Sequence, residues 1–263
     1  MTKAKAKGFT LLEVSIALSI LAFLSYTITL GVKATRDYDA YNDNEVYLEN
    51  VRVALLTFAQ SNGYLPCPDT DTVMDGVENR TGGICTSKNG RLPYKMLGVA
   101  QGDAWGEALH YSVNNKADNT ASPVPIDDPL ESASYFNSTT APLFTLNTEP
   151  VGVTKGGGNY SVCSENSTAA NCETSTCPSH MLECAAIAVV VSFGKNGADT
   201  WAMYNAGTVN LLDAAEEQNA DDNNYFWKSN GSNVVGQEYD DQLIWLTGYD
   251  VKYALLKSER GLQ

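Results

Sequence analysis

An apolar run near the N-terminus constrains this chain more than any other feature of its sequence. Residues 9–32 form a 24-residue stretch with one charged side chain, Glu13. A helix rises about 1.5 Å per residue, so this stretch would extend ~36 Å, enough to cross a bilayer with some tilt. The basic residues Lys3, Lys5 and Lys7 precede it, and such flanks stay on the cytoplasmic side of a membrane. The sequence therefore predicts one spanning helix, with the rest of the chain outside.

Two simple interpretations of this run do not account for all of its features. A secretory signal would have a shorter apolar core and a small-residue cleavage site, whereas the chain here continues with a helical pattern. A plain anchor explains the length but not the carboxylate, which costs at least a few kcal/mol inside a membrane. If the chain were cut between Gly8 and Phe9, the new ammonium group of Phe9 could neutralise Glu13 in lipid.

The stretch KGFTLLEVSIALSILA, residues 7–22, closely resembles the N-terminus of type IV prepilins. In that family a short basic leader ends in Gly, a Phe follows, and Glu is the fifth residue of the mature chain. The resemblance implies cleavage between Gly8 and Phe9 by a prepilin peptidase, N-methylation of Phe9, and assembly into a filament. It also implies that Glu13 pairs with the Phe9 amine of a neighbouring subunit during assembly.

The helix is expected to continue well beyond the apolar run. Asn62 and Gly63 tolerate the left-handed conformation that ends helices, so we expect one helix over about 9–62. Its second half is amphipathic, because apolar residues recur there at three- to five-residue steps: Val46, Val51, Ala54, Leu55, Phe58 and Ala59. Such a helix, lipid-embedded first and core-packing second, is the handle of the type IV pilin fold.

The rest of the chain reads as a β-rich head. The pattern predicts strands at 107–114, 185–194, 199–207 and 241–249, and a short helix at 249–259. The segments 115–184 and 213–238 are rich in Asn, Ser, Thr, Pro, Gly and Asp and are predicted to be loops. These features give an α+β class, and the resemblance to type IV prepilins implies the type IV pilin fold, with the long helix packed on an antiparallel sheet.

Four successive parts follow from these predictions. With the prepilin resemblance, we expect residues 1–8 to be a leader peptide, 9–32 the transmembrane and filament-core helix, 33–62 its amphipathic half, and 63–263 a globular head. We expect the precursor to be single-pass in the bacterial inner membrane with a periplasmic head, and the assembled protein to be in an extracellular pilus.

The cysteines indicate disulfides in an oxidising compartment. All six follow the apolar run, and an even count outside a membrane predicts three bridges, with the connectivity open. Zinc is disfavoured because there are two histidines and no CxxC pair. We expect one bridge to close the loop 67–85, stabilising the head by ~3 kcal/mol, and two local bridges within 163–184. The candidates are Cys67, Cys85, Cys163, Cys172, Cys177 and Cys184.

The charge balance bears on partners. The chain has 31 acidic and 17 basic residues, and without the leader it would have 14 basic residues and a formal charge of −17. Such a surface repels nucleic acid and anionic lipid, so no direct nucleic-acid partner is expected. We expect the partners to be other pilin subunits, the prepilin peptidase and N-methyltransferase, the membrane, and an inner-membrane assembly platform.

The head carries a second, more scattered resemblance. The stretches LPCPDTD and DAWGEALHYSV look like those of minor-pilin-like proteins, and VVVSFGKNGADT and YDDQLIW look like elements of the major pseudopilins of type II secretion. The chain departs from the short pseudopilins because long segments separate these elements. The pseudopilin resemblance implies a calcium site, and the matching positions are near Asn196, Asp199, Asp240 and Asp241. The alternative is that Asp240 and Asp241 form a solvated turn. The acidic stretch 69–76 lacks the spacing of an EF-hand.

No catalytic constellation stands out, and we expect no enzyme and no required cofactor, with calcium as an option. His110 and His180 are the only imidazoles, and Ser112 beside His110 is expected to be a strand neighbour. The sequence favours a minor pilin of a type IV pilus, at the tip or in initiation or adhesion. One alternative is a pseudopilin of a type II secretion system. Another is a membrane-anchored adhesive or ligand-binding protein.

Overall fold

The computed structural model describes residues 10–113, 118–119, 148–149, 160–164, 181–211, 214–229, 232–234 and 237–257. The chain divides into two compact units, Met1–Asp43 and Asn44–Gln263, and each is described by itself.

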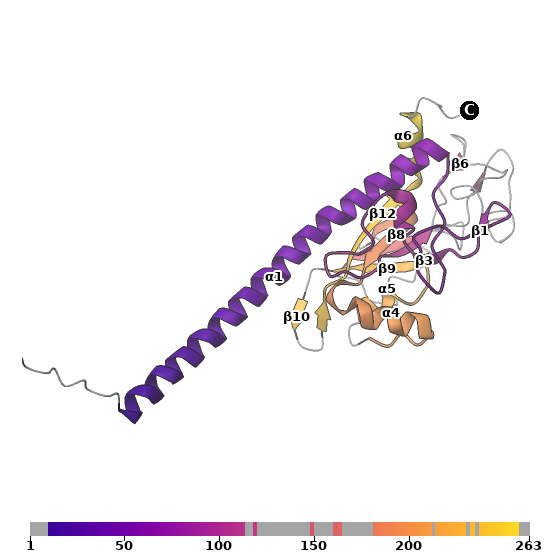
Figure 1. The fold of residues 1–263 in the computed structure, drawn as a ribbon. Coiled ribbons are helices and arrows are strands. Elements are labelled where there is room, and N and C mark those ends of the chain that lie inside the picture. The colour runs from indigo at the N-terminus through magenta and orange to yellow at the C-terminus, as the bar shows by residue number, and fades with distance from the viewer. Residues whose placement is uncertain are drawn as a thin grey trace, which may run out of the picture. The chain divides into compact units, whose positions relative to one another are not determined.

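The long helix predicted from the sequence is present. Helix α1 runs from Leu11 to Asn62, through 52 residues (Figure 1). It ends where the sequence predicts, because Gly63 adopts a φ of +86° and its N–H still donates to the carbonyl of Ala59 at 2.7 Å. Glycine takes this left-handed conformation without the steric cost that a side chain would bring.

The head is built on a six-stranded sheet, which confirms the α+β class. Strand β8 is central: it pairs antiparallel with β4 and β12 along its second half and with β7 along its first. Strand β3 extends the sheet beyond β4, and β9 extends it beyond β7. The strands are β3 (Asn89–Arg91), β4 (His110–Val113), β7 (Tyr160–Ser164), β8 (Met181–Ser192), β9 (Tyr225–Lys228) and β12 (Gln242–Thr247).

One pairing corrects the prediction of a purely antiparallel sheet. Strands β7 and β9 are parallel, with Ser161 opposite Tyr225 and Ser164 opposite Lys228. Parallel neighbours require a long crossover connection. Strand β8 and the helices η2, α4 and α5 lie between β7 and β9 in the described part of the chain, and they belong to that crossover. The three strands predicted within 107–114, 185–194 and 241–249 are confirmed as β4, β8 and β12.

The segments predicted to be loops contain regular structure in their described parts. Strand β7 lies within 115–184, and a short helix and a strand of the main sheet lie within 213–238. Small two-stranded ribbons add to these. The ribbons are β1–β2 (Arg80–Thr81, Ile84–Cys85), β5–β6 (Asp118–Asn119, Thr148–Glu149) and β10–β11 (Ser232–Val234, Gln237–Tyr239). The shorter helices are α2 (Tyr94–Leu97), η2 (Gly194–Asn196), α4 (Gly197–Ala206), α5 (Ala214–Asn219) and α6 (Gly248–Leu256).

The strand predicted at 199–207 is wrong, because these residues form most of α4. Helical spacing brings Gly197, Thr200 and Trp201 to one buried side. The Trp201 indole N–H donates to the carbonyl of Ala108 at 2.7 Å, which ties the helix to the residues before β4. Gly207 ends the helix at a φ of +64°. The C-terminal helix predicted at 249–259 is confirmed as α6.

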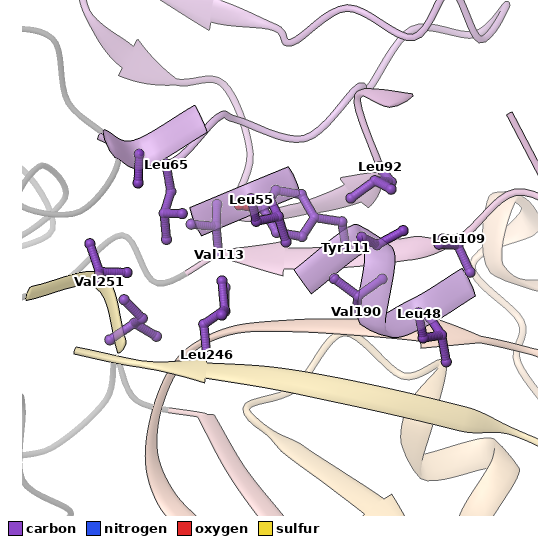
Figure 2. Close-up of a cluster of buried hydrophobic side chains, with 14 of the residues drawn as sticks. Leu48, Leu55, Leu65, Leu92, Leu109, Tyr111, Val113, Val190, Leu246 and Val251 are labelled. Atoms are coloured by element: carbon purple, nitrogen blue, oxygen red, sulfur yellow. The ribbon is translucent and has the colours of Figure 1, made fainter. Parts of the chain in front are cut away.

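The sheet buries apolar side chains on both faces, since neighbouring residues of a strand point to opposite sides. One core contains Val190 of β8 and Leu246 of β12 with residues of α1 and α6 (Figure 2). The other contains Val189 and Val191 of β8 with Trp201 of α4. The first core holds Leu48, Val51, Leu55, Ala59, Leu65, Leu92, Leu109, Tyr111, Val113, Ile187, Ala188, Val190, Leu246, Val251 and Leu255.

The Asp-Ala-Trp-Gly stretch forms the turn that leads into β4. The buried Asp103 carboxylate accepts hydrogen bonds from the N–H groups of Trp105 and Glu107, both at 2.9 Å. Its other oxygen accepts the hydroxyl of Ser192 at 2.6 Å. Gly106 supplies a φ of +89°. The motif is therefore explained by turn geometry and by its attachment to the end of β8.

Candidate functional site

The apolar half of α1 is the first candidate site. The segment Leu11–Thr29 has a mean hydropathy of 2.0 and is long and apolar enough to cross a membrane, and none of it is buried within the protein. Its large side chains are exposed all round the helix. A surface of this kind is covered by lipid or by other apolar helices. The exposed residues are Leu11, Leu12, Val14, Ile16, Leu18, Ile20, Leu21, Phe23, Leu24, Tyr26 and Ile28.

The serine and threonine hydroxyl groups of this segment are satisfied within the helix. Ser15 donates to the carbonyl of Leu12, and Ser19 to that of Ser15, both at 2.8 Å. Ser25, Thr27 and Thr29 donate in the same way to carbonyls three or four residues earlier. An unpaired polar group costs several kcal/mol in lipid, so these bonds make the polar side chains compatible with an apolar environment.

Glu13 has a partner that the sequence analysis missed. Its Oε2 accepts the backbone N–H of Thr10 at 2.8 Å and the Thr10 hydroxyl at 2.9 Å. The Glu13 N–H is 3.2 Å from the same hydroxyl oxygen, to which it donates. This reciprocal arrangement is a capping box, and the Thr-x-x-Glu spacing that signals it is visible in the sequence.

The capping box explains the position of Glu13 but does not cancel its charge. A carboxylate in the first turn of a helix gains roughly 0.3–1 kcal/mol from the helix dipole. Placing it inside a membrane costs at least a few kcal/mol. The Thr10 contact therefore offsets part of the cost, and a nearby cation would be needed for the rest. The predicted cleavage residues Gly8 and Phe9 lie outside the described residues.

Comparison with protein families identifies this N-terminus. Residues 3–25 match the prokaryotic N-terminal methylation motif. The chain carries a type IV prepilin-like signal. No curated protein matches the chain, and no solved structure does.

The prepilin-like signal sets the general class of the protein. It supports a subunit of the pilin or pseudopilin kind, which is a structural class and not an enzyme family. It implies processing by a prepilin peptidase and assembly with other pilins. The single N-terminal apolar helix of this prepilin-like chain is consistent with membrane anchoring. The fold, an apolar helix followed by an α+β head, is consistent with the type IV pilin fold.

The disulfide predicted after the long helix is present. Cys67 and Cys85 are bonded and close a loop with a sequence separation of 18. Cys163 in β7 and Cys184 in β8 are also disulfide-bonded. The last two cysteine candidates, Cys172 and Cys177, lie outside the described part of the chain. The bridge at 67–85 holds the loop that crosses from α1 to β3.

The predicted calcium residues are brought together only in part. Asp240 and Asp241 lie in one acidic cluster, and the third residue of this cluster is Glu216 of α5. Carboxylate oxygens of the three residues lie within 4.8 Å of one another. Asp199 does not belong to this group: it lies exposed in the first turn of α4. The reason is that residues 199–207 form a helix rather than a strand. Glu216 was missed because its segment was predicted to be a loop.

Neighbouring groups organise this acidic cluster. The Asn196 amide donates to Glu216 Oε2 at 2.8 Å, and the backbone N–H of Lys195 donates to Asp240 Oδ2 at 3.0 Å. Asp241 is buried and accepts the Asn219 amide at 2.8 Å. Asn196 Oδ1 is buried without a hydrogen-bond partner. Carboxylate and carboxamide oxygens are the ligands that calcium prefers.

The acidic stretch 69–76 has a structural role. Asp69 is fully buried, and its carboxylate accepts the backbone N–H groups of Asp71, Asp75 and Gly76 at 2.8–3.2 Å. These bonds fold the disulfide-closed loop back on itself. Asp69, Asp71 and Asp75 form a second acidic group for this reason. The stretch is therefore accounted for without a ligand.

Proposed function

We propose that the mature chain is a minor-pilin-like structural subunit of a bacterial type IV pilus. One observation carries the proposal: a prepilin-like signal is followed by a helix whose apolar side chains, from Leu11 to Thr29, are left exposed by the described part of the chain. Such a helix is stable in the membrane as a precursor and among like helices in a filament. The head, with buried cores on both faces of its sheet, folds as a display domain.

Glu13 is proposed to act during assembly. Cleavage between Gly8 and Phe9 would leave an ammonium group four residues before Glu13. That group on a neighbouring subunit would neutralise the carboxylate that the Thr10 contacts leave charged. Because a charge pair in lipid is strongly favoured over two separate charges, the pairing would fix the axial register between subunits.

Location and partners follow from this proposal. The precursor is placed in the inner membrane with its head in the periplasm, and the mature protein in the pilus. Its partners are other pilin subunits, the prepilin peptidase with its N-methyltransferase activity, and the inner-membrane assembly platform. A position at the tip, with a role in initiation or adhesion, suits a head longer than a simple shaft subunit needs.

A pseudopilin of a type II secretion system is the second candidate. The favouring observation is the turn of Asp103, Ala104, Trp105 and Gly106 leading into β4, which resembles the corresponding element of the major pseudopilins. Neighbouring genes separate the two: a retraction ATPase with pilus genes supports the pilus, and secretin with secretion genes supports the pseudopilin.

Three substitutions at the start of α1 test the assembly role. Glu13→Gln keeps a side chain that can complete the capping box but removes the charge. Glu13→Val removes both, and Thr10→Ala removes the cap while keeping the charge. We expect both Glu13 variants to be almost absent from sheared filaments, with the head still folded, and Thr10→Ala to be incorporated to a larger extent. Normal incorporation of Glu13→Gln would show that capping, not charge, is the role of Glu13.

We also propose that calcium binds among Glu216, Asp240 and Asp241. Support comes from the carboxylate oxygens within 4.8 Å of one another and from the buried Asn196 Oδ1 beside them. Calcium should raise the unfolding temperature of the full chain relative to chelator, and Asp241→Asn should abolish the increase. Asp199→Asn, on the exposed face of α4, is the matched control and should leave it intact. An equal loss in both variants, or no effect of calcium on the parent, would contradict the site.

A further inference from the structure

Helix α6 carries large apolar side chains on both of its faces. Its inward side chains Val251, Ala254 and Leu255 are at most 4 % exposed. Its outward side chains Tyr249, Tyr253 and Leu256 are 57–70 % exposed and follow one another at helical spacings of four and three. A surface helix normally presents a polar outer face, and a helix that is apolar all round is normally buried. The outer face of α6 therefore has the composition of a covered surface.

Two polar or charged side chains at the ends of α6 make contacts within the molecule. Asp250 forms a capping box with Thr247 at the start of the helix and an ion pair with Arg52 of α1 at 2.9 Å. Lys257, the residue that caps the end of α6, lies over the Tyr253 ring at 4.2 Å. The outward face thus presents two tyrosines and a leucine, with the half-buried Lys252 at its edge and Lys257 at one end.

Helix α1 presents a face of opposite character beside α6. Val46 and Val53, seven residues apart, are 64 % and 54 % exposed, and the acidic residues Glu45 and Glu49 are exposed along the same stretch. Arg52 bridges Glu49 and Asp250, so the two helices lie next to each other (Figure 1). Both faces point outward from the molecule. They therefore cannot cover each other within one chain.

We propose that the outward face of α6 (Tyr249, Tyr253, Leu256 and Lys257) docks on the acidic face of α1 (Glu45, Val46, Glu49 and Val53) of a second copy. Apolar groups would then meet apolar groups, and Lys257 would meet a glutamate, in a chain that is otherwise strongly acidic. Two different patches of one molecule make a heterologous contact, which propagates as a helical array when it does not close into a ring. The inference rests on the proposed function, because a filament is such an array.

A photoreactive benzoylphenylalanine at position 253 of the full-length chain, in its native membrane and filaments, tests this docking. The substitution keeps an aromatic ring at an exposed position, so folding should be preserved. We expect an irradiation product of twice the chain mass. Trypsin should release from it a cross-linked peptide from α1, either residues 37–52 or 53–80, since no lysine or arginine lies between Arg36 and Arg52 or between Arg52 and Arg80.

The control carries the same photoreactive residue at Leu182 of β8, another exposed apolar position, and should give no such peptide. The docking would be overturned by a cross-linked dimer whose peptide comes from outside residues 37–80. An adduct to a different protein or to lipid would overturn it as well. So would the absence of product in filaments that contain the variant. Processing of Phe9, measured in the same sample, reports on the proposed function separately. A processed chain without the cross-link sinks this inference alone.

Discussion

The Nε2 atom of His110 lies 3.6 Å from Oδ1 of Asp222 in the head, and His110 is 1 % exposed. The rings of Phe193, Trp201 and Tyr204 surround the imidazole at centroid distances of 5.3–5.9 Å. Asp222 also accepts the Tyr204 hydroxyl at 2.7 Å, and it holds a φ of +63°, which is uncommon outside glycine and asparagine. These contacts fasten the connection between α5 and β9 to the sheet.

This environment predicts a loss of stability in acid. Burial raises the pKa of Asp222, but the nearby His110, the hydrogen bond from Tyr204 and the charge of Lys88 outweigh burial and leave that pKa below its usual value. A carboxyl group whose pKa is lower in the folded than in the unfolded chain stabilises the folded state at pH values above the unfolded-state pKa. This stabilisation is lost as the pH falls through the folded-state pKa. The unfolding temperature should therefore fall below about pH 4, and less so in Asp222→Asn, which also tolerates the positive φ.

The effect in Asp222→Asn should be modest, because the Asp222 side chain is 49 % exposed and solvent screens its interactions. Asp199→Asn provides the control at an exposed position of α4. The measurement is the unfolding midpoint of the full chain in detergent across the acid range. An identical acid dependence in the parent and in Asp222→Asn would contradict the assignment.

Tyr47 predicts a second loss of stability, in base. Burial, with the charge of Asp103, raises the pKa of Tyr47 to about 12, and its hydroxyl donates to the carbonyl of Ala100 at 2.6 Å. In the unfolded chain the phenol ionises near pH 10, so the unfolded state releases its proton first as pH rises. The contribution of Tyr47 to the free energy of unfolding should be constant below about pH 10 and fall from there to about 12. Tyr47→Phe should be less stable near neutral pH but show a shallower alkaline decline.

Two positions in the second half of α1, two residues apart, should differ strongly in their effect on stability. Leu55 is fully buried in the first core, whereas Val53 is 54 % exposed. Leu55→Ala should lower the free energy of unfolding by about 2–5 kcal/mol, through lost burial and the cavity left behind. Val53→Ala should change it by less than about 0.5 kcal/mol. Denaturant unfolding followed by tryptophan fluorescence compares the two, and equal effects would mean that the helix does not pack as described.

Substitution of Gly194 by alanine should cause a steric clash in addition to backbone strain, and the two effects can be separated. It adopts a φ of +61°, and an added Cβ would collide with the Asp240 carboxylate. Gly207 has nearly the same φ, +64°, with nothing within 4 Å of an added Cβ. Gly194→Ala should therefore be more destabilising than Gly207→Ala, which reports the strain alone. Thermal unfolding compares the variants, and similar losses would show that Asp240 can move aside.

The long helix was predictable because its signals are local. Composition marks the apolar run, periodicity marks the second half, and Asn62-Gly63 marks the end, which the structure places at the same residue. The capping box of Thr10 and Glu13 is equally local, although a carboxylate in an apolar run first suggests a cationic partner. A Thr-x-x-Glu spacing before an apolar run is sufficient to predict it.

The helix at 197–206 shows where periodicity misleads. Its short alternating pattern was interpreted as a strand, although Gly197, Thr200, Trp201 and Tyr204 also recur at steps of three and one. Short apolar runs fit both periods, and burial against the sheet decides between them. Trp201 belongs to the second core and reaches it from a helix. This packing depends on where β4 and β8 lie, which the local sequence does not show.

The acidic cluster shows that long-range contacts limit how much of a site can be predicted from the sequence. Asp240 and Asp241 are adjacent in sequence and were singled out, but Glu216 lies 24 residues earlier. The parallel pairing of β7 with β9 and the antiparallel pairing of β12 with β8 bring these segments together. No local pattern encodes a sheet of this order, so the third carboxylate could not be chosen from the sequence.

N-terminal peptide mass spectrometry of the protein from its native membrane tests the central claim most directly. Trypsin cuts after Lys7 and Lys33, so an uncleaved precursor yields a peptide beginning at Gly8. A processed subunit yields residues 9–33, and we predict this peptide with one added methyl group on Phe9. A peptide that begins at Gly8 in the mature fraction would leave Glu13 without its amine partner and would contradict assembly as a pilin-like subunit.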